Sequence, residues 1–367
     1  MGSLLRPKRL LERLGDFQAR EANVAMAEGQ GVPDELRALE DELINGAVTR
    51  QIDAGLDVVS DGEFRRAFFT GGVDVALSGF QPNQAKIVFE NAAGETMEST
   101  GRPTVASRLE KIGNPLVPEA EFLARITDHP FKITMPAASM YQWYGVWRPG
   151  ITDQAYADVD ALANHFVALL REFVDEAVAA GCHYIQFDFP FYPLYVNERH
   201  RSNWRAMGFD DEAYLERILR VDRELVEGLP SDVHTALHLC RGNAGDWWLT
   251  SGSLDPVAEQ VFALPYDSFL VEWDDKLRDG DYSALRHVPK GPVVAVGIVS
   301  TKRREVESAD QVVREIDAAS GYLDVDQLAI TAQCGFGTVA GMESVDEDTQ
   351  WRKLAVIGEV ADRVWPR

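Results

Sequence analysis

The sequence predicts an α/β protein folded as a (β/α)8 barrel. Apolar runs rich in β-branched residues alternate along the chain with segments of helical spacing, which is the order expected for a parallel sheet. These runs are nearly continuous, as strands buried on both faces must be. No Gly-x-Gly-x-x-Gly motif follows an early run, so an open dinucleotide-binding sheet is not favoured over the closed barrel.

Seven strands and six helices can be placed in chain order. The expected strands are Asp57–Ser60, Phe131–Thr134, Tyr184–Asp188, Val233–Cys240, Ser268–Glu272, Val293–Gly297 and Gln327–Ile330. The expected helices lie at about 34–54, 153–180, 211–228, 255–264, 308–319 and 346–363. A barrel needs an eighth strand whose natural place is just before Gly2, so we expect a first strand that is very short or truncated.

The whole chain, 1–367, is expected to form a single barrel domain, because α/β barrels of this length are common as one unit. The least regular part is the interval at about 64–131, which contains glycine pairs and polar stretches. We expect this interval to be a β-rich excursion on the rim of the barrel.

The charge balance limits the kind of partner. The chain has 36 Lys and Arg against 59 Asp and Glu, a formal net charge of −23 at pH 7, which leaves no basic surface for nucleic acid or an anionic membrane. No stretch approaches the roughly 18 apolar residues of a membrane span. We therefore expect a soluble, cytoplasmic protein that acts on small molecules.

A metal site is the sharpest chemical signal. His238 and Cys240 lie two positions apart on an expected strand, so their side chains point to the same face. Taken alone, this pair is more often core filling than ligation. However, Glu272 ends another strand and Cys334 closely follows a third, and the carboxyl ends of barrel strands are where such enzymes place their active sites. One nitrogen, two sulfurs and one oxygen form a coherent ligand set for Zn²⁺.

This ligand set points to thiol chemistry. Hydrolytic zinc usually has nitrogen and oxygen ligands, whereas two thiolates favour a site that holds a third sulfur from the substrate. A free thiol has a pKa of roughly 8.5, and coordination to zinc deprotonates it outright. Because a carboxylate is a harder donor than a thiolate, Glu272 is the ligand expected to yield to the substrate sulfur.

Two acidic residues at other strand ends, Glu63 and Asp188, would face the same rim. They could bind the ammonium group of an amino acid substrate. An equally plausible role is an ion pair with a nearby arginine, such as Arg65 or Arg66.

Taken together, these motifs resemble the catalytic barrel of cobalamin-independent methionine synthase, especially short single-barrel proteins that lack the N-terminal half of the long enzyme. The resemblance spans most of the chain. It rests on the segments Gly2–Pro7, Ser60–Arg66, Gln186–Asp188, His238–Asn243, Glu272, Val299–Lys302 and Gln333–Phe336.

The resemblance implies a barrel of the methionine synthase and uroporphyrinogen decarboxylase type. It implies zinc bound by His238, Cys240, Glu272 and Cys334, and the amino acid part of homocysteine bound by Ser3, Glu63 and Asp188. Lys302 aligns near a histidine that assists methyl departure in the long enzyme, so the resemblance makes Lys302 the candidate catalytic residue. The methyl donor is left open between a folate and another carrier.

The leading function is therefore zinc-dependent methyl transfer to homocysteine, which gives methionine. A second hypothesis is an enzyme similar to the family members that open epoxides with coenzyme M, a sulfonated thiol for which Arg65, Arg66, Arg241 and Lys302 are candidate anion contacts. A third hypothesis, a non-catalytic protein that binds zinc or a thiol, ranks below both, since structural zinc usually has four closed ligands from adjacent loops. The sequence does not reveal the oligomeric state.

Overall fold

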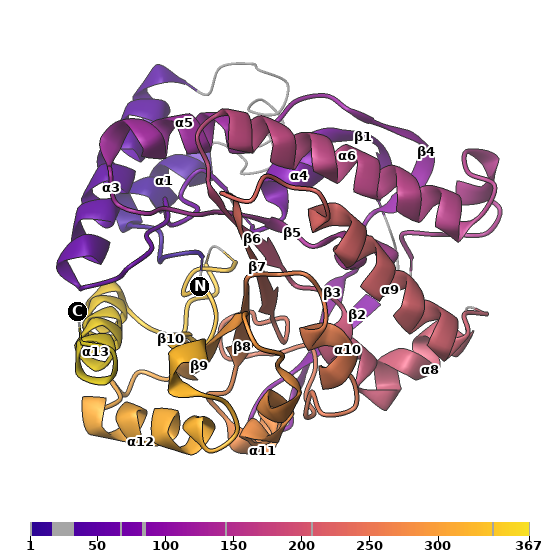
Figure 1. Cartoon of the computed structure of the whole chain (residues 1–367). Coiled ribbons are helices and arrows are strands. Elements are labelled where there is room, and N and C mark those ends of the chain that lie inside the picture. Colours follow the sequence, from indigo (N-terminus) through magenta and orange to yellow (C-terminus); the bar gives the residue numbers. More distant parts are fainter. Residues whose placement is uncertain are drawn as a thin grey trace.

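The computed structural model describes residues 2–16, 33–66, 68–82, 86–143, 145–206, 208–339 and 341–366. A parallel sheet lies at its centre (Figure 1). The sheet has six strands that neighbour one another in chain order: β5 Ile133–Pro136, β6 Tyr184–Asp188, β7 His234–Leu239, β8 Ser268–Glu272, β9 Val293–Val299 and β10 Leu328–Ala332. Six of the seven expected strands are thereby confirmed: two have the expected bounds, and the ends of the other four differ by at most two residues.

Two irregular segments complete the barrel between β5 and β10. The segment around Val59 joins the edge of β5 by a parallel bridge to Phe131 and accepts a hydrogen bond from Lys132 N at 2.9 Å. Residues 2–7 take the place of the remaining barrel strand. Leu4 N donates to Gly62 O at 3.0 Å, and Ser3 O accepts from Phe336 N at 2.8 Å. The expected strand Asp57–Ser60 is thus wrong in extent, because only Val59 pairs before the chain turns at positive φ through Gly62 and Glu63.

Helices surround the strands, as Figure 1 shows. They are α1 Lys8–Asp16, α3 Asp34–Asp53, α4 Gly71–Val75, α5 Leu116–Ile126, α6 Val159–Ala179, α7 Tyr192–Tyr195, α8 Glu198–Ala206, α9 Asp211–Val226, α10 Ala258–Phe262, α11 Lys276–Asp279, α12 Ala309–Ser320 and α13 Glu347–Val364. All six expected helices are present among them. Within the described ranges, no helix is long and apolar enough to cross a membrane.

The interval from 64 to 131 contains two small antiparallel sheets in addition to α4 and α5. Strand β1 Leu77–Gln81 pairs with β4 Thr104–Lys111, and β2 Lys86–Glu90 pairs with β3 Thr96–Thr100. The β2–β3 hairpin is tied to the loop after β7, because Glu90 and Trp248 exchange two backbone hydrogen bonds of 2.8 Å. The hairpin therefore reaches over the carboxyl ends of the barrel strands.

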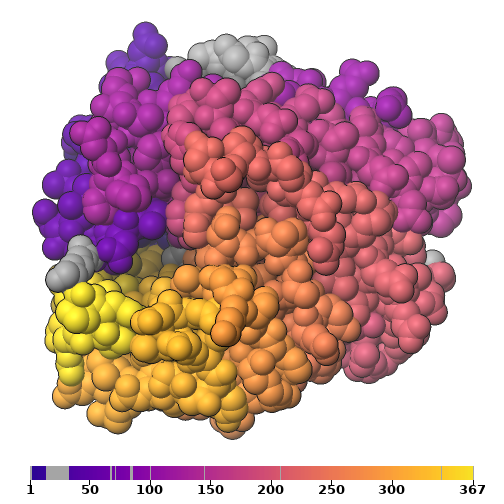
Figure 2. All heavy atoms as spheres, viewed as in Figure 1, coloured from indigo at the N-terminus to yellow at the C-terminus, as the bar shows by residue number. Residues whose placement is uncertain are grey.

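The first and last parts of the chain lie side by side, indigo beside yellow in Figure 2. The contact is tightest at Gly358 in α13, where an added Cβ would lie 1.9 Å from the backbone oxygen of Ala54 just after α3. We expect Gly358→Ala to lower the free energy of unfolding by about 1–3 kcal/mol, the usual cost of overpacking. Urea unfolding would measure this change. The matched control is Gly46→Ala inside α3, where nothing lies within 4 Å of the new Cβ and no loss of stability is expected.

Candidate metal centre

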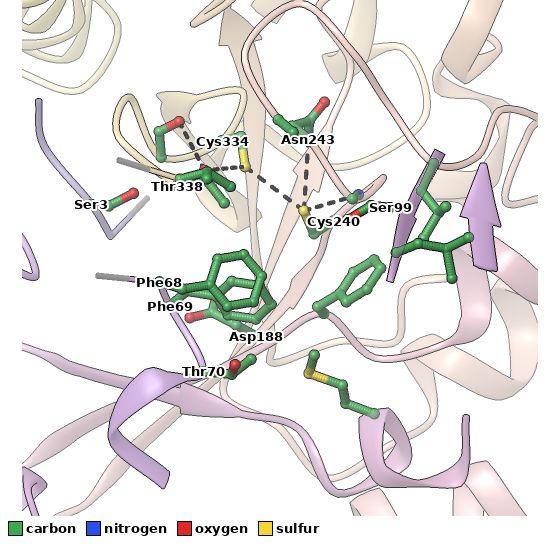
Figure 3. A pocket seen from close by; sticks show the side chains of 18 of the residues that line it. Ser3, Phe68, Phe69, Thr70, Ser99, Asp188, Cys240, Asn243, Cys334 and Thr338 are labelled. Carbon is green, nitrogen blue, oxygen red and sulfur yellow. Dashed lines mark hydrogen bonds between the residues drawn. The ribbon is translucent and has the colours of Figure 1, made fainter. Parts of the chain in front are cut away.

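The four predicted metal ligands meet at the carboxyl ends of the barrel strands. One ligand atom from each of His238, Cys240, Glu272 and Cys334 lies within 4.8 Å of every other, and all four residues are buried. The two sulfur atoms are 3.7 Å apart and face each other in Figure 3. His238 belongs to β7 and Cys240 directly follows its end, whereas Glu272 ends β8 and Cys334 comes two residues after β10. Residues nearly a hundred positions apart thus converge on one point.

The hydrogen bonds of His238 suit a metal ligand. Asp188 and His238 are paired across β6 and β7, and Nδ1 of His238 lies 2.8 Å from Oδ1 of Asp188. This bond places the neutral ring's proton on Nδ1 and leaves Nε2 with its lone pair. Nε2 is buried and meets no hydrogen-bond partner in the described part of the chain. A metal ion would satisfy this atom, and with two sulfurs and a carboxylate the donor set fits zinc.

The two thiols interact with each other. The hydrogen bond between Cys240 and Cys334 and the nearby His238 lower the pKa of Cys334 well below its usual value. Burial and the proximity of Cys334 raise the pKa of Cys240. Burial alone would keep His238 neutral, but Asp188 and Cys334 outweigh it and raise the pKa of His238 to about 9. Without metal, protons thus supply the positive charge that a divalent cation would bring.

Glu272 is fully buried and strongly hydrogen-bonded. Its Oε1 accepts from Arg241 N and from Asn243 Nδ2, both at 2.6 Å, and its Oε2 accepts from Gln333 Nε2 at 2.7 Å. Burial opposes its charge, but Lys302, Arg278 and His238 lower the pKa of Glu272 below its ordinary value. It is therefore a carboxylate whose position is set by its neighbours.

Glu63 and Ser3 line the same cavity as the cysteines, which has a volume of about 450 Å³. Oε1 of Glu63 accepts from the hydroxyl of Thr134 at 2.9 Å, while its Oε2 is buried and has no hydrogen-bond partner among the described residues. Burial and the charges of Asp188 and Asp61 raise the pKa of Glu63 to about 7, although Arg66 opposes them. Ser3 packs closely against Gly335, because a Cβ added to Gly335 would lie 2.1 Å from Ser3 Oγ.

Lys302 occupies a different place from the other predicted residues. It is not among the residues that line the cavity, and its Nζ lies 3.8 Å from Glu272 Oε2 and 3.9 Å from Asp274 Oδ1. Arg241 also turns away, because its guanidinium group donates to Gly252 O at 2.6 Å and pairs with Asp279. Neither side chain lines the cavity.

Three residues that contact the site were not predicted individually. Thr134, Asn243 and Gln333 hold the carboxylates of Glu63 and Glu272. Asn243 and Gln333 lie within the motifs around Cys240 and Cys334. Asn243 also donates to Cys240 Sγ at 3.7 Å (Figure 3). A buried amide next to a metal-ligand motif is thus the signal that could have identified them.

Comparison with known proteins shows the family of the chain. A family model described as the catalytic domain of cobalamin-independent synthase matches residues 15–356. The chain is 30% identical over 372 residues to YxjH, an uncharacterized protein of Bacillus subtilis, covering 100% of this chain and 93% of that protein. It is 24% identical over 290 residues to the methionine synthase of Pyrococcus abyssi, covering 79% of this chain and 74% of the relative.

Among solved structures, a B12-independent methionine synthase from a Shewanella species, in complex with selenomethionine, has the same fold. Its TM-score is 0.68 at 21% sequence identity, and the match covers 91% of this chain and 90% of that one. This likeness confirms the barrel that the sequence predicts. The chain therefore belongs to the cobalamin-independent methionine synthase family and, as a match to its catalytic domain, is a methyltransferase.

Proposed function

We propose that this protein is a zinc-dependent methyltransferase that methylates the sulfur of homocysteine to give methionine. The observation that carries the proposal is that His238, Cys240 and Cys334, three of the four clustered residues, line one cavity with an unpartnered carboxylate oxygen of Glu63. One part of the cavity suits a thiol and the other suits an ammonium group. In the overall reaction, a carbon–sulfur bond forms, the bond from the methyl group to its donor breaks, and the thiol proton is lost.

The chemistry that zinc supplies when bound is a lowered pKa of the substrate thiol, so that sulfur is present as the nucleophilic thiolate at neutral pH. The residues proposed to hold zinc are His238, Cys240, Glu272 and Cys334. Asp188 orients His238 through its Nδ1 proton. Such outer hydrogen bonds typically contribute about 10-fold to 100-fold to metal affinity.

We propose that the substrate's ammonium group is bound by Glu63 and Asp188, next to Ser3. The two hydrogen bonds that the Asp188 side chain accepts from described residues, from His238 and Gln186, both go to Oδ1, so Oδ2 is available to a ligand. The free Oε2 of Glu63 offers a second anionic oxygen in the same cavity. A buried carboxylate without a partner is costly, and an ammonium ligand would remove that cost.

The methyl donor would approach from the apolar side of the cavity. Its walls there include Phe68, Phe69, Ile87, Phe89 and Met97, the last three from the β2–β3 hairpin. Such walls exclude water, which protects a thiolate from competing protonation. The identity of the donor is left open.

A sulfonated thiol such as coenzyme M fits these surroundings less well. Arg65 pairs with Asp41, and Arg66 pairs with Glu119. Neither these arginines nor Arg241 and Lys302 line the cavity, and the one arginine that does among the described residues, Arg102, is paired with Asp74. A sulfonate needs a cation that is free to bind it, so an amino acid thiol is favoured.

Zinc-edge X-ray absorption of the zinc-loaded protein would test the proposal. We expect homocysteine to add a sulfur neighbour to the metal, and coenzyme M at the same concentration to add none, because it lacks the ammonium group that Glu63 would bind. New sulfur coordination with coenzyme M alone would refute the homocysteine assignment. No response to either thiol would favour a non-catalytic zinc protein.

A further inference from the structure

Lys302 is a buried cation with an unused hydrogen-bonding group. Its side chain is 8% exposed, and its Nζ makes no hydrogen bond to any described residue. The two nearest carboxylate oxygens, from Glu272 and Asp274, are 3.8 and 3.9 Å away, close enough for attraction but too far for a hydrogen bond. A small movement of Glu272 would bring its Oε2 into contact with this ammonium group.

The other cation beside Glu272 is already committed. Arg278 donates to Asp274 at 2.5 Å and to Asp279 at 2.7 and 2.9 Å, and reaches Glu272 Oε2 only at 3.4 Å. Asp274 is likewise engaged, because it also accepts from Ser300 Oγ at 2.5 Å. Among the described residues around Glu272, Lys302 is therefore the cation free to respond.

The charge of the site explains why a responsive cation is needed. Two thiolates and the Glu272 carboxylate around Zn²⁺ with a neutral His238 sum to −1, and a substrate thiolate makes the buried sum −2. An uncompensated charge of this size is costly inside a protein. An ammonium group that is close, buried and not hydrogen-bonded offsets it without rearranging the rest of the network.

We propose that Lys302 is a positioning residue of the metal centre. Its ammonium group forms an ion pair with the Glu272 carboxylate when the substrate sulfur binds, and it balances the negative charge that this sulfur adds. This inference rests on the proposed function. It gives Lys302 a role through Glu272 in place of direct contact with the methyl donor, in keeping with its position outside the cavity. The lysine would weaken zinc binding in the resting site and strengthen thiol binding.

The test is Lys302→Met, a neutral side chain of similar length. In the wild-type protein the ammonium group repels Zn²⁺ and attracts the substrate thiolate. Without this charge, we expect the Kd for Zn²⁺ to fall about tenfold and the Kd for homocysteine to rise about tenfold. Chelator competition measures the first constant. The thiolate-to-metal absorption band of the cobalt(II)-substituted protein, titrated with homocysteine, measures the second.

Controls separate this role from general damage to the site. Lys302→Arg keeps the charge and is expected to restore both constants to within about threefold, while Lys302→Gln is a second neutral variant in case Lys302→Met does not fold. Arg303→Met removes the same charge one residue along, from a side chain that is 55% exposed and 3.7 Å from Asp274, and should leave both constants unchanged.

Two outcomes in the neutral variants would overturn the inference about Lys302 but not the proposed function. One is no change in either constant, and the other is a loss of both zinc and thiol affinity. If the unchanged protein binds zinc but shows no absorption change with homocysteine, the proposed function fails as well. The measurements on wild type and variant therefore distinguish the two failures.

Discussion

Replacing Cys334 by serine is expected to remove zinc from the protein and to lower methyl transfer to homocysteine by about a thousandfold or more. Serine keeps the size of the side chain but stays protonated at neutral pH, so the site loses one of its two thiolates. The remaining thiol, Cys240, also loses the sulfur atom that lies 3.7 Å away. Zinc per chain after dialysis, measured by elemental analysis, would test this directly.

The matched control is Cys182→Ser. Cys182 is also buried, but its thiol donates to Tyr184 O at 3.1 Å, and burial raises its pKa to about 11. It stands outside the four-residue cluster, so its variant should retain zinc at the wild-type level. Undiminished zinc in Cys334→Ser would remove Cys334 from the ligand set, and with it the main support for thiol activation.

The clustering of the four candidate metal ligands could be predicted, because it follows largely from backbone geometry. Side chains two apart on a strand share a face, and the carboxyl ends of parallel strands meet at one edge. Asp188, His238 and Glu272 all lie at such ends, and their placement needs no knowledge of side-chain packing. These positions are set as soon as the strand order is known.

The place of Lys302 could not be predicted in the same way. A long, flexible side chain can point toward the cavity or away from it, and the choice depends on Glu272 and Asp274, which belong to a different part of the chain. Alignment to a histidine suggested contact with the donor, whereas the ammonium group lies near Glu272 and Asp274 and outside the cavity. Its catalytic role at the donor remains a prediction that the geometry does not favour.

The sequence indicated a very short first strand and a β-rich rim, but not which residues pair there or line the cavity. Residues 2–7 carry no strand pattern, and their backbone hydrogen bonds join distant parts of the chain: Leu4 N donates to Gly62 O, and Ser3 O accepts from Phe336 N. Phe89 and Met97 reach the cavity through a hairpin that is anchored at Trp248, far along the chain. Such nonlocal pairing leaves no periodic signal in the sequence.

Glu63→Gln is expected to lower kcat/KM for homocysteine about a hundredfold, mainly through a higher KM. The amide keeps the shape of the side chain and can still accept from Thr134, but it removes the charge that would face the substrate's ammonium group. Loss of one partner from a buried ion pair costs about 3–5 kcal/mol, which is more than two powers of ten in affinity. The effect falls on KM, because the ammonium group is bound equally before and during methyl transfer.

The same residue predicts a pH dependence that can be read with methionine, whose sulfur does not ionise. Because the pKa of Glu63 is raised to about 7, the carboxylate is lost as the pH falls, and methionine should bind more weakly in acid. The midpoint should lie at or below pH 7, since nearby zinc would favour the charged form. Calorimetric titrations between pH 5 and pH 8 would show this slope in wild type and a flat profile in Glu63→Gln.

A second buried glutamate separates charge recognition from a general effect of losing an acid. Glu40 in α3 is 2% exposed, and burial raises its pKa to about 7 as well, but it pairs with Arg37 and does not line the cavity. Glu40→Gln should therefore leave both KM and the pH profile of methionine binding unchanged. If Glu63→Gln kept the acid-sensitive binding, the ammonium group would have to be held by Asp188 alone, and the free oxygen of Glu63 would have no part in choosing an amino acid substrate.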